Sequence, residues 1–533
     1  IRSALESGAH VTITTANAGT NAEAGDIIWG EGLNTPVLNF NDREHGTLTL
    51  NASNNINFAQ GKIWDNNSGG GDSLNLILNA GTGISVADDF VIETAGGYIE
   101  FNAGTGAVNF NNSTIIIESG NITINDTAAG VDFGTSTIDT SGGNLVIFET
   151  AGTTAAQGSV NFNASSISTG SGHITIFDAD GSGSLAAGSV NFGLGTGIGS
   201  INTDGGNITI GDATGGVDFG SGTGANAINT NGGNLVVFET NVGTSAQGVV
   251  DFNAREIDLA GGAITIFDAA ATDVAVQGVD FGTSNINAEG GVIINNTAGI
   301  IDLASSTITT GGGDFTSLVS ASVSSTASSI NTTGGTNIDG GAIHIETTGA
   351  LTLDSLTADG GASSGSQGDS AQVGRSGGNI TLESMNHAVT VTAAISTTGE
   401  LGNFNNSDDF GQNGGNGGNV IITANDITNG AISIAAITTS GGEAAGDNSH
   451  IHEANGGDAG DIDLNAVTNI YVAGEIKAVG GVGKGDYHRT GNTNFGLGGD
   501  GGNISITANN IAISDNINAS MGTDDRSDNP SPA

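Results

Sequence analysis

Apolar residues alternate with polar ones in short bursts along residues 120–282. Leu145 and Ile147, and likewise Ile174 and Ile176, are separated by a single residue. A period of two is that of a β-strand. Each burst is three to five residues long and is bounded by Gly, Asn, Asp, Ser and Thr, which adopt turn conformations readily. The pattern predicts many short strands and leaves no room for a helix between them.

The bursts belong to a repeat. The segment GGNLVIFET at 142–150 returns as GGNLVVFET at 232–240. Each copy holds smaller units made of Gly-Gly-Asn, an apolar-x-apolar triplet, an acidic residue and a Val-x-Phe triplet. The Val-x-Phe triplets begin at Val108, Val131, Val160, Val190, Val217, Val250 and Val279. Their spacing, roughly 23–33 residues, is a solenoid period.

One unit is therefore one coil, and we predict an all-β chain that forms a right-handed parallel β-helix, or β-solenoid. Equivalent residues of successive coils would stack about 4.8 Å apart. Leu145, Ile147, Val160 and Phe162 are expected to point inward. The narrow interior needs only a thin row of apolar side chains, which agrees with a hydrophobic content of 36%.

The rhythm of the repeat changes after about residue 311. Later strands start at Ala342, Asn379, Asn419, Asp461 and Asn503, so the period lengthens to about 37–42 residues. The added length forms Gly-rich insertions at 358–376, 399–416, 440–458 and 480–500. Because they recur at one phase of the coil, they should emerge on one face as a ridge of stacked loops, where specific contacts would lie.

This change predicts three regions. Residues 1–310 form a regular β-helix with coils of about 22–34 residues. Residues 311–522 form a β-helix with coils of about 37–42 residues and extruded loops, and residues 523–533 form a polar C-terminal tail. Neither a capping helix nor a polar terminal repeat is evident at either end. We therefore expect the ends of the helix to expose unpaired strands, a template for head-to-tail stacking into a filament.

Composition agrees with a β-solenoid. The 533 residues include 92 Gly but only 3 Pro, and the glycines lack the three-residue period of collagen. There is no Cys, which suits a chain exported unfolded. No apolar run approaches the roughly 18 residues of a membrane span, and no signal peptide opens the sequence. Since the first residue is Ile1, we expect a processed chain or a segment of a longer one.

The charge restricts the partners. With 9 Lys and Arg against 55 Asp and Glu, the formal net charge is −46. Such a chain repels phosphate backbones and anionic lipid surfaces, so we expect no nucleic-acid partner and no membrane insertion.

Three segments near the start, GAHVTITT, GDIIW and GTLTLNASNNINFAQGKI within residues 8–63, carry a family resemblance. They resemble the repeats of filamentous-haemagglutinin-like exoproteins of bacterial two-partner secretion. The resemblance implies a secreted β-helical fibre, extracellular or on the bacterial cell surface, that acts in adhesion, biofilm or cell contact. The family's amino-terminal secretion domain and its Asn-Pro-Asn-Leu type motif are absent, since the only Asn-Pro is Asn529-Pro530.

Stacked carboxylates are the first feature that could carry chemistry. One set follows the apolar triplet, and another occupies the centre of Val-x-Phe. Adjacent carboxylates about 5 Å apart repel by roughly 0.8 kcal/mol in water, which bound Ca²⁺ would relieve. The alternative is a solvated face that deters aggregation. The calcium-binding β-roll nonapeptide is approached only singly, at 414–422 and 456–464. The two sets are Glu93, Asp126, Glu149, Asp178, Asp212, Glu239 and Asp268, and Asp132, Asp218, Asp251 and Asp280.

Histidines and phenylalanines form the other two features. His450, His452 and His488 lie near Asp447, Glu453 and Asp486 in the insertions and could hold Zn²⁺, or could simply be exposed. Four phenylalanines each follow an inward residue, and would either fill a corner of the core or form an outward apolar stripe. They are Phe148, Phe177, Phe238 and Phe267.

Catalysis fits the sequence poorly. β-Helical polysaccharide lyases need a basic groove, whereas the few Lys and Arg here are scattered, and no hydrolase, phosphate-loop or dinucleotide motif occurs in a suitable setting. We assign no catalytic, cofactor-binding or metal-ligating residue. The expected function is a structural or adhesive extracellular fibre, a subunit of a head-to-tail filament. The alternative is an adhesin stalk that binds a host or neighbouring-cell ligand through the loop ridge, and a polysaccharide-acting enzyme is remote.

Overall fold

The computed structural model divides the chain into two compact units, Ile1–Ser284 and Asn285–Ala533, here unit 1 and unit 2. One helix is present among the described residues, α1 (Arg2–Leu5), and no helix among them is long and apolar enough to cross a membrane. The structure describes residues 1–15, 25–30, 37–40, 45–65, 73–125, 127–148, 158–176, 188–193, 199–211, 213, 215–220, 228–238, 247–253, 255–266, 276–295, 297–364, 373–403, 411–445, 454–484 and 496–524.

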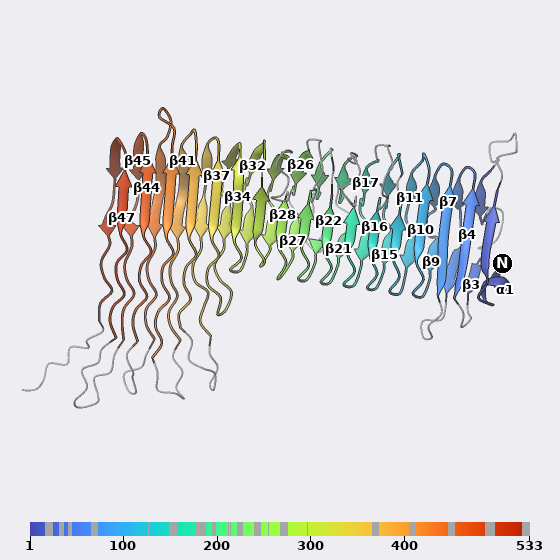
Figure 1. The fold of residues 1–533 in the computed structure, drawn as a ribbon, viewed down its shortest axis with the longest axis horizontal. Coiled ribbons are helices and arrows are strands. Elements are labelled where there is room, and N and C mark those ends of the chain that lie inside the picture. Colours follow the sequence, from blue (N-terminus) through green and yellow to red (C-terminus); the bar gives the residue numbers. More distant parts are fainter. Residues whose placement is uncertain are drawn as a thin grey trace, which may run out of the picture. The chain divides into compact units, whose positions relative to one another are not determined.

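Unit 1 is a parallel β-helix in which each coil adds one strand to each of three ladders (Figure 1). The first ladder holds β1 (His10–Thr14), β4 (Gly46–Ala52), β7 (Leu74–Ala80), β10 (Ile99–Ala103), β13 (Ile122–Ile124), β16 (Leu145–Ile147), β19 (Ile174–Ile176), β22 (Ile208–Ile210), β25 (Leu235–Val237) and β28 (Ile264–Ile266). The second holds β2 (Ile27–Trp29), β5 (Ile56–Phe58), β8 (Ile84–Val86), β11 (Val108–Phe110), β14 (Val131–Asp132), β17 (Val160–Asn161), β20 (Val190–Asn191), β23 (Val217–Asp218), β26 (Gln247–Asp251) and β29 (Val276–Asp280). The third holds β3 (Val37–Phe40), β6 (Lys62–Asp65), β9 (Val91–Glu93), β12 (Thr114–Ile116), β15 (Thr137–Asp139), β18 (Ser166–Ser168), β21 (Ser200–Asn202), β24 (Ile228–Asn229) and β27 (Glu256–Asp258).

The predicted inward residues of unit 1 are confirmed. Leu145, Ile147, Val160 and Phe162 are all buried, and Leu145 pairs in parallel register with Ile122 on one side and with Ile174 on the other. The period of two fixes this register, because a slip by one residue would turn the apolar side chains outward.

A stack of phenylalanines runs through the core of unit 1. The rings of Phe110, Phe133, Phe162, Phe192, Phe219, Phe252 and Phe281 follow one another with centroids 4.8–5.2 Å apart and interplanar angles of 3–8°. These are the Phe positions of the Val-x-Phe triplets. The centroid spacing is that of neighbouring coils in a β-ladder, so the rings hold equivalent positions coil after coil.

In unit 1 the Gly-Gly-Asn motif forms the corner before β16, β22 and β25, and related sequences such as Ser-Gly-His at 171–173 form it before other strands of the first ladder. In the coil that contains Gly172, the buried Thr169 hydroxyl donates to the Gly172 carbonyl oxygen (2.5 Å). Gly143 must lack a side chain, because a Cβ there would lie 1.6 Å from the Gly120 carbonyl oxygen. The Asn144 side-chain oxygen then accepts the backbone N–H of His173 in the next coil (2.8 Å). The motif therefore joins successive coils.

Unit 2 repeats the three-ladder arrangement, and two long strands, β41 and β43, each serve the second and third ladders in turn. The first ladder holds β31 (Val292–Asn295), β34 (Phe315–Ser320), β37 (Ile343–Thr347), β40 (Ile380–Ser384), β42 (Val420–Ala424), β44 (Ile462–Ala466) and β47 (Ile504–Thr507). The other two hold β30 (Asn285–Asn287), β32 (Ile300–Asp302), β33 (Thr307–Thr309), β35 (Ser322–Ser324), β36 (Ser329–Asn331), β38 (Leu351–Leu353), β39 (Ser355–Thr357), β41 (Val389–Ser396), β43 (Ile432–Thr438), β45 (Asn469–Val472), β46 (Ile476–Lys477), β48 (Asn510–Ile513) and β49 (Ile517–Asn518).

The insertions of unit 2 all leave at one corner, between the third ladder and the next strand of the first, as predicted (Figure 1). Their described parts form five outgoing legs, at 357–364, 397–403, 439–445, 478–484 and 519–524, and four return legs, at 373–379, 411–419, 454–461 and 496–502. We call these nine legs the glycine double layer. They contain no helix and, apart from Thr357, no strand.

Backbone hydrogen bonds join the legs within and between the two layers. Outgoing legs bond to outgoing legs, as Gly399 N–H does to Ser440 (2.9 Å), and return legs bond to return legs, as Gly417 N–H does to Asp458 (2.8 Å). A zigzag links the layers, with Gly415 N–H donating to Glu400, Gly442 to Gly415, Gly457 to Gly442 and Gly481 to Gly457, all at 2.7–2.9 Å. The insertions are thus an ordered packing of backbones.

Only glycine fits this packing. A Cβ on Gly457 would lie 1.9 Å from the Gly415 carbonyl oxygen, and one on Gly481 would lie 1.8 Å from that of Gly442. On the outer face, the side chains of Asn413, Asn416 and Asn419 accept backbone N–H groups of the next return leg at 2.8, 2.9 and 2.7 Å. The contacts recur every third residue, as in a polyproline II helix, which has three residues per turn and no internal hydrogen bonds. The glycines of the whole chain lack a three-residue period, so this local period of three is not evident from the composition.

The first end of unit 1 differs from the expectation that no helix covers it. Helix α1 contacts β1, β3 and β4, and its Leu5 side chain is fully buried. The four residues RSAL are too few to show a helical period, so this helix could not be predicted. The predicted boundary at residues 310 and 311 marks a change in coil length rather than the division between units, and it stays a prediction.

Candidate functional site

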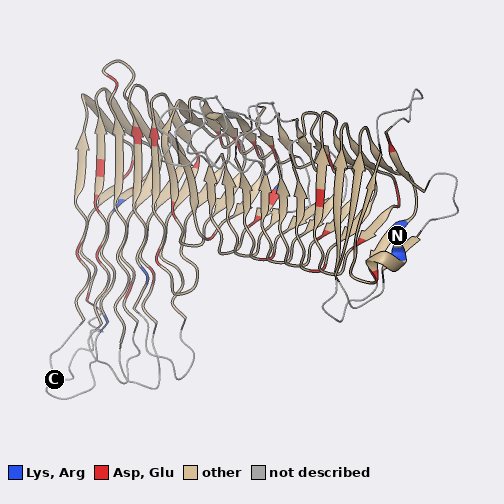
Figure 2. Cartoon of the chain, turned by 45° about the vertical axis from the view of Figure 1, so that its right-hand side comes forward, with Lys and Arg blue, Asp and Glu red and all other residues tan. Residues whose placement is uncertain are grey.

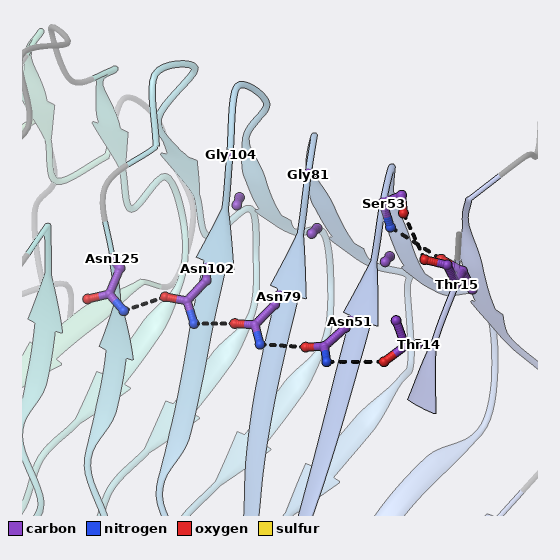
Figure 3. A pocket seen from close by; sticks show the side chains of 12 residues that line it. Thr14, Thr15, Asn51, Ser53, Asn79, Gly81, Asn102, Gly104 and Asn125 are labelled. Atoms are coloured by element: carbon purple, nitrogen blue, oxygen red, sulfur yellow. Dashed lines mark hydrogen bonds between the residues drawn. The ribbon is translucent and has the colours of Figure 1, made fainter. Parts of the chain in front are cut away.

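An open pocket of about 480 Å³ lies in unit 1, where β1, β4, β7 and β10 end (Figure 3). Its lining is neutral and consists of small or amide side chains. We call it the asparagine groove, and it is lined by Thr14, Thr15, Asn51, Ala52, Ser53, Asn79, Ala80, Gly81, Asn102, Ala103, Gly104 and Asn125.

A ladder of side-chain amides forms one wall of the groove (Figure 3). Asn102 Nδ2 donates to Asn79 Oδ1 (2.7 Å), and Asn79 Nδ2 donates to Asn51 Oδ1 (2.7 Å). Asn51 Nδ2 donates to the Thr14 hydroxyl (3.3 Å) at one end, and Asn125 Nδ2 donates to Asn102 Oδ1 at the other. An amide has two N–H donors and two acceptor lone pairs. Each rung therefore keeps hydrogen-bonding capacity beyond its ladder bonds.

The floor and the opposite wall of the groove are formed by alanine and glycine residues. Ala52, Ala80 and Ala103 are buried beside the ladder, and Gly81 and Gly104 are exposed beyond them. A Cβ on Gly81 would lie 2.3 Å from the Ser53 carbonyl oxygen, and one on Gly104 would lie 2.3 Å from that of Gly81. The close approach of successive turns thus excludes larger side chains and keeps the groove open.

The ladder ends at the coil after Asn125. There Phe148 takes the register position of the amide and turns inward: its φ is +67° and its side chain is 3% exposed. Its backbone N–H donates to the Ile124 carbonyl oxygen (2.6 Å). The amide ladder therefore spans the coils from Thr14 to Asn125.

The groove is uncharged in a strongly acidic chain. Acidic side chains are scattered over the described residues and basic ones are few (Figure 2). Glu100 is the carboxylate next to the ladder, and its Oε1 accepts from Asn102 Nδ2 (2.9 Å) and Asn125 Nδ2 (3.1 Å). These two amides therefore use both N–H groups within the protein, whereas Asn51 and Asn79 each use one in the bonds among the described residues.

The Val-x-Phe carboxylates form an outward column in unit 1, as expected. Asp218 pairs with Asp251, and Asp251 with Asp280, whereas Asn161 and Asn191 separate Asp132 from them. Burial raises the pKa of Asp251, and the charges of Asp280 and Asp218 raise it further, against a lowering by the Asn253 backbone N–H. Burial, and to a smaller extent the neighbouring carboxylates, therefore disfavour ionisation at the middle of the column.

A buried cation lies beside this column. Burial lowers the pKa of Arg255, and the charge of Asp218 acts in the opposite direction. The Arg255 Nη2 atom lies 3.1 Å from where a Cβ on Gly220 would be, so the guanidinium occupies room left by a glycine. Arg255 therefore offsets part of the negative charge of the column.

Most of the other predicted candidates lie outside the described residues. Glu93, on β9, is described, and burial followed by the charge of Glu118 raises its pKa while Lys62 lowers it. The described residues contain no group of three or more His, Cys, Asp or Glu side chains placed to hold one metal ion. Calcium and zinc binding stay alternatives to the solvated face and to the exposed histidines. The candidates outside the described residues are Asp126, Glu149, Asp178, Asp212, Glu239, Asp268, Asp447, His450, His452, Glu453, Asp486 and His488.

Two of the four phenylalanines are described, and both point inward. Phe148 and Phe238 are buried, with φ of +67° and +66°, so the outward-stripe alternative is wrong for them. Phe177 and Phe267 lie outside the described residues. A positive φ turns two consecutive side chains to the same side, which the alternation rule for strands does not anticipate.

The asparagine groove was not predicted. Its sequence signal is an Asn followed by a small residue after the apolar alternation, in TLNAS, LNAGT and FNAGT. No protein-family model, curated protein or solved structure matches this chain. The resemblance to filamentous-haemagglutinin-like exoproteins therefore stays a prediction.

Proposed function

We propose that the protein is an extracellular structural and adhesive fibre protein, a subunit that stacks head to tail into a bacterial surface filament. The observation that carries this proposal is the open edge of unit 2. Strands β47, β48 and β49 pair with β44, β45 and β46, and no other strand among the described residues pairs with them.

This edge exposes side chains that the preceding coil buries. Ile511 is 48% exposed whereas its register partner Ile470 is 1% exposed, and Ile517 is 52% exposed whereas Ile476 is 0% exposed. An unpaired edge above an apolar face is a template for another strand. A coil of the same register fits it, and β1, β2 and β3 of a second copy would supply one. Among the described strands they pair only with β4, β5 and β6. Helix α1 contacts β1 and β3 at that end, so it would have to move aside for the coils to pair.

Such a contact joins two different surfaces of the chain, so it does not close on itself and generates a filament. We expect purified chain to form assemblies that grow in steps of one chain length in negative-stain images and in light scattering. The double variant Ile511→Lys/Ile517→Lys should remain monomeric, because the added coil would bury two unpaired lysine charges.

Ile427→Lys is the matched control, because Ile427 is 84% exposed and lies outside these strands. It should assemble as the parent does. A chain that stays monodisperse at 52.2 kDa at low and moderate salt would contradict the filament. Equal assembly by the double variant would contradict the proposed contact.

The glycine double layer favours a second function, an adhesin that binds a cell-surface or matrix ligand through the loop ridge. Four segments, 365–372, 404–410, 446–453 and 485–495, each connect an outgoing leg to a return leg. They carry all seven aromatic and histidine residues of the insertions, Phe404, Phe410, His450, His452, Tyr487, His488 and Phe495. A chain whose insertions are removed should then lose binding to cells and still self-associate.

We further propose that the chain is not an enzyme and needs no cofactor. The asparagine groove supports this, because its lining contains no carboxylate, histidine or basic side chain. General acid–base and nucleophilic catalysis both require such groups.

A further inference from the structure

We infer that the asparagine groove binds a linear, uncharged polysaccharide chain that runs parallel to the coil stack, with about one sugar ring over each coil. This inference gives the proposed adhesive fibre a ligand class, and to that extent it rests on the proposed function. It concerns unit 1 and uses neither the open edge of unit 2 nor the glycine double layer.

The spacing of the rungs selects the kind of polymer. The amides of Asn51, Asn79 and Asn102 hold equivalent positions in successive coils, and coils in unit 1 are about 5 Å apart, as the phenylalanine stack shows. An extended peptide presents equivalent groups every two residues, or roughly 6.6 Å, so it falls out of step with the rungs. The length of one sugar ring in a straight glycan is close to one coil spacing, so each ring lies beside one rung. Where successive rings are flipped, as in a β-1,4-linked glycan, equivalent hydroxyls return at every second coil.

The chemistry of the walls fits hydroxyl groups. Sugar hydroxyls both donate and accept, as do the rungs: Asn51 and Asn79 each have an N–H that no bond among the described residues uses, and the amide oxygens have a second lone pair. The buried methyl groups of Ala52, Ala80 and Ala103 give an apolar floor for the C–H face of a ring. Polar groups that fix orientation over an apolar floor are typical of small-ligand sites.

Charge excludes the acidic glycans. No Lys, Arg or His lines the groove, and the chain as a whole carries −46. Uronate or sulfate groups would be repelled over the whole surface with no local cation to hold them. The ligand is therefore a neutral glycan.

The length of the ladder limits the ligand. It runs from Thr14 to Asn125 over five coils, or four coil spacings, and ends where Phe148 turns inward. Four spacings of about 4.8 Å give roughly 19 Å, which about four sugar rings would fill. Affinity should therefore rise with chain length up to about four rings and then level off.

The test uses the full chain at concentrations where light scattering shows single molecules, with a length series of cello-oligosaccharides as straight neutral probes. Titration calorimetry should show affinity that rises up to about four rings. Oligogalacturonates of the same lengths should bind at least tenfold more weakly. No binding by any cello-oligosaccharide, affinity that does not depend on length, or equal binding of the acidic series would each overturn the inference.

Variants separate the groove from the rest of the surface. Asn51→Ala/Asn79→Ala removes the two rungs with spare N–H groups, and loss of about two hydrogen bonds should weaken binding about tenfold. The matched control is Asn57→Ala/Asn109→Ala, two outward asparagines on β5 and β11 that do not line the groove. It should leave binding unchanged.

If the ladder variant loses its fold, Ser53→Tyr gives a second test. Ser53 is exposed at the rim, so a bulky side chain there obstructs the groove without replacing a rung, and binding should again fall. A ladder variant that melts earlier but binds the probe as the parent does would assign the amides a purely structural role and overturn the inference. Because no glycan enters the self-association assay, failure here leaves the filament proposal to its own test.

Discussion

The corner before the first ladder is built in the same way in the two units, yet it holds very different lengths of chain. In unit 1 the Thr169 hydroxyl donates to a glycine carbonyl three residues later. In unit 2 the Thr397 and Thr439 hydroxyls make the same bond, at 2.7 Å, to Gly418 and Gly460, which lie 21 residues later. Each pair of legs is therefore inserted between two residues that remain in contact.

The comparison shows that two kinds of packing coexist in one chain. Unit 1 closes its coils tightly and fills its core with stacked phenylalanine rings, so side chains set the fit between coils. The glycine double layer of unit 2 has almost no side chain between neighbouring legs, so backbone hydrogen bonds set the fit. Substitutions that test the two should therefore differ: loss of a ring damages the first, and gain of a methyl group damages the second.

The largest effect is expected for Phe252→Asp in unit 1. Phe252 is fully buried between Phe219 and Phe281, with centroids at 4.8 and 4.9 Å. Loss of the ring costs about 3–5 kcal/mol, and an unpaired buried charge adds to that. Hydrogen exchange should show lost protection in peptides of unit 1. The neighbouring outward change, Asp251→Asn, is the control, and an equal loss of protection in both variants would contradict the inward assignment.

A smaller loss is expected for Gly457→Ala in the glycine double layer. The new methyl group would lie 1.9 Å from the Gly415 carbonyl oxygen, so the legs must separate, at a cost of about 1–3 kcal/mol for overpacking. Exchange should increase in legs 411–419 and 454–461. Gly335→Ala is the matched control in unit 2, because its nearest neighbours would be 3.5 Å or more away. Equal hydrogen exchange of the legs in the two variants would contradict the close packing of the legs.

Asp251→Asn should stabilise unit 1 slightly at neutral pH. Burial raises the pKa of Asp251 in the folded chain, so the ionised carboxylate opposes folding above that pKa. The penalty disappears as the pH falls below the unfolded value, near 3.8. The melting temperature of the variant should exceed that of the parent at pH 7, and the two should converge near pH 3. A gain that persists unchanged at pH 3 would assign the effect to something other than the charge.

The smallest effect on the coils is expected when the four insertions are removed. Residues 360–376, 399–416, 441–458 and 480–500 would be deleted and each corner rewritten as Thr-Asn-Gly-Gly, the sequence of Thr230–Gly233. Asn is chosen because the second corner residue has positive φ, +47° at Asn231. Protection of β42 and β44 should be retained. Their collapse would show that the legs support the coils.

Much of the fold could be predicted because it depends on near neighbours in the sequence. The alternation around Leu145 and the Val-x-Phe triplets specify which side chains are buried, and a one-residue slip would expose them. The position of the insertions within the coil could also be predicted, because the Gly-Gly-Asn motif that precedes Ile380 and Val420 marks the same corner as in unit 1.

Other features depend on contacts between residues far apart. The order in the legs comes from backbone bonds between residues such as Gly442 and Gly415, where the sequence shows only glycine. A clue was present in NGGNGGN at 413–419, whose period of three matches the outward asparagines. The amide ladder is similar, since Asn51 and Asn79 become a site only when their coils are adjacent. Helix α1 is too short for any periodic signal.

The three-residue period of the return legs also makes their length adjustable in fixed steps. One Asn-Gly-Gly unit is one turn and advances a leg by roughly 9 Å. Adding one such unit to an outgoing leg and one to its return leg would carry the connecting segment outward by that amount, while Thr397 and Gly418 stay bonded at the corner. Gain or loss of whole units would therefore set, in steps of one turn, how far a connecting segment lies from the coils. The β-helix itself would not change.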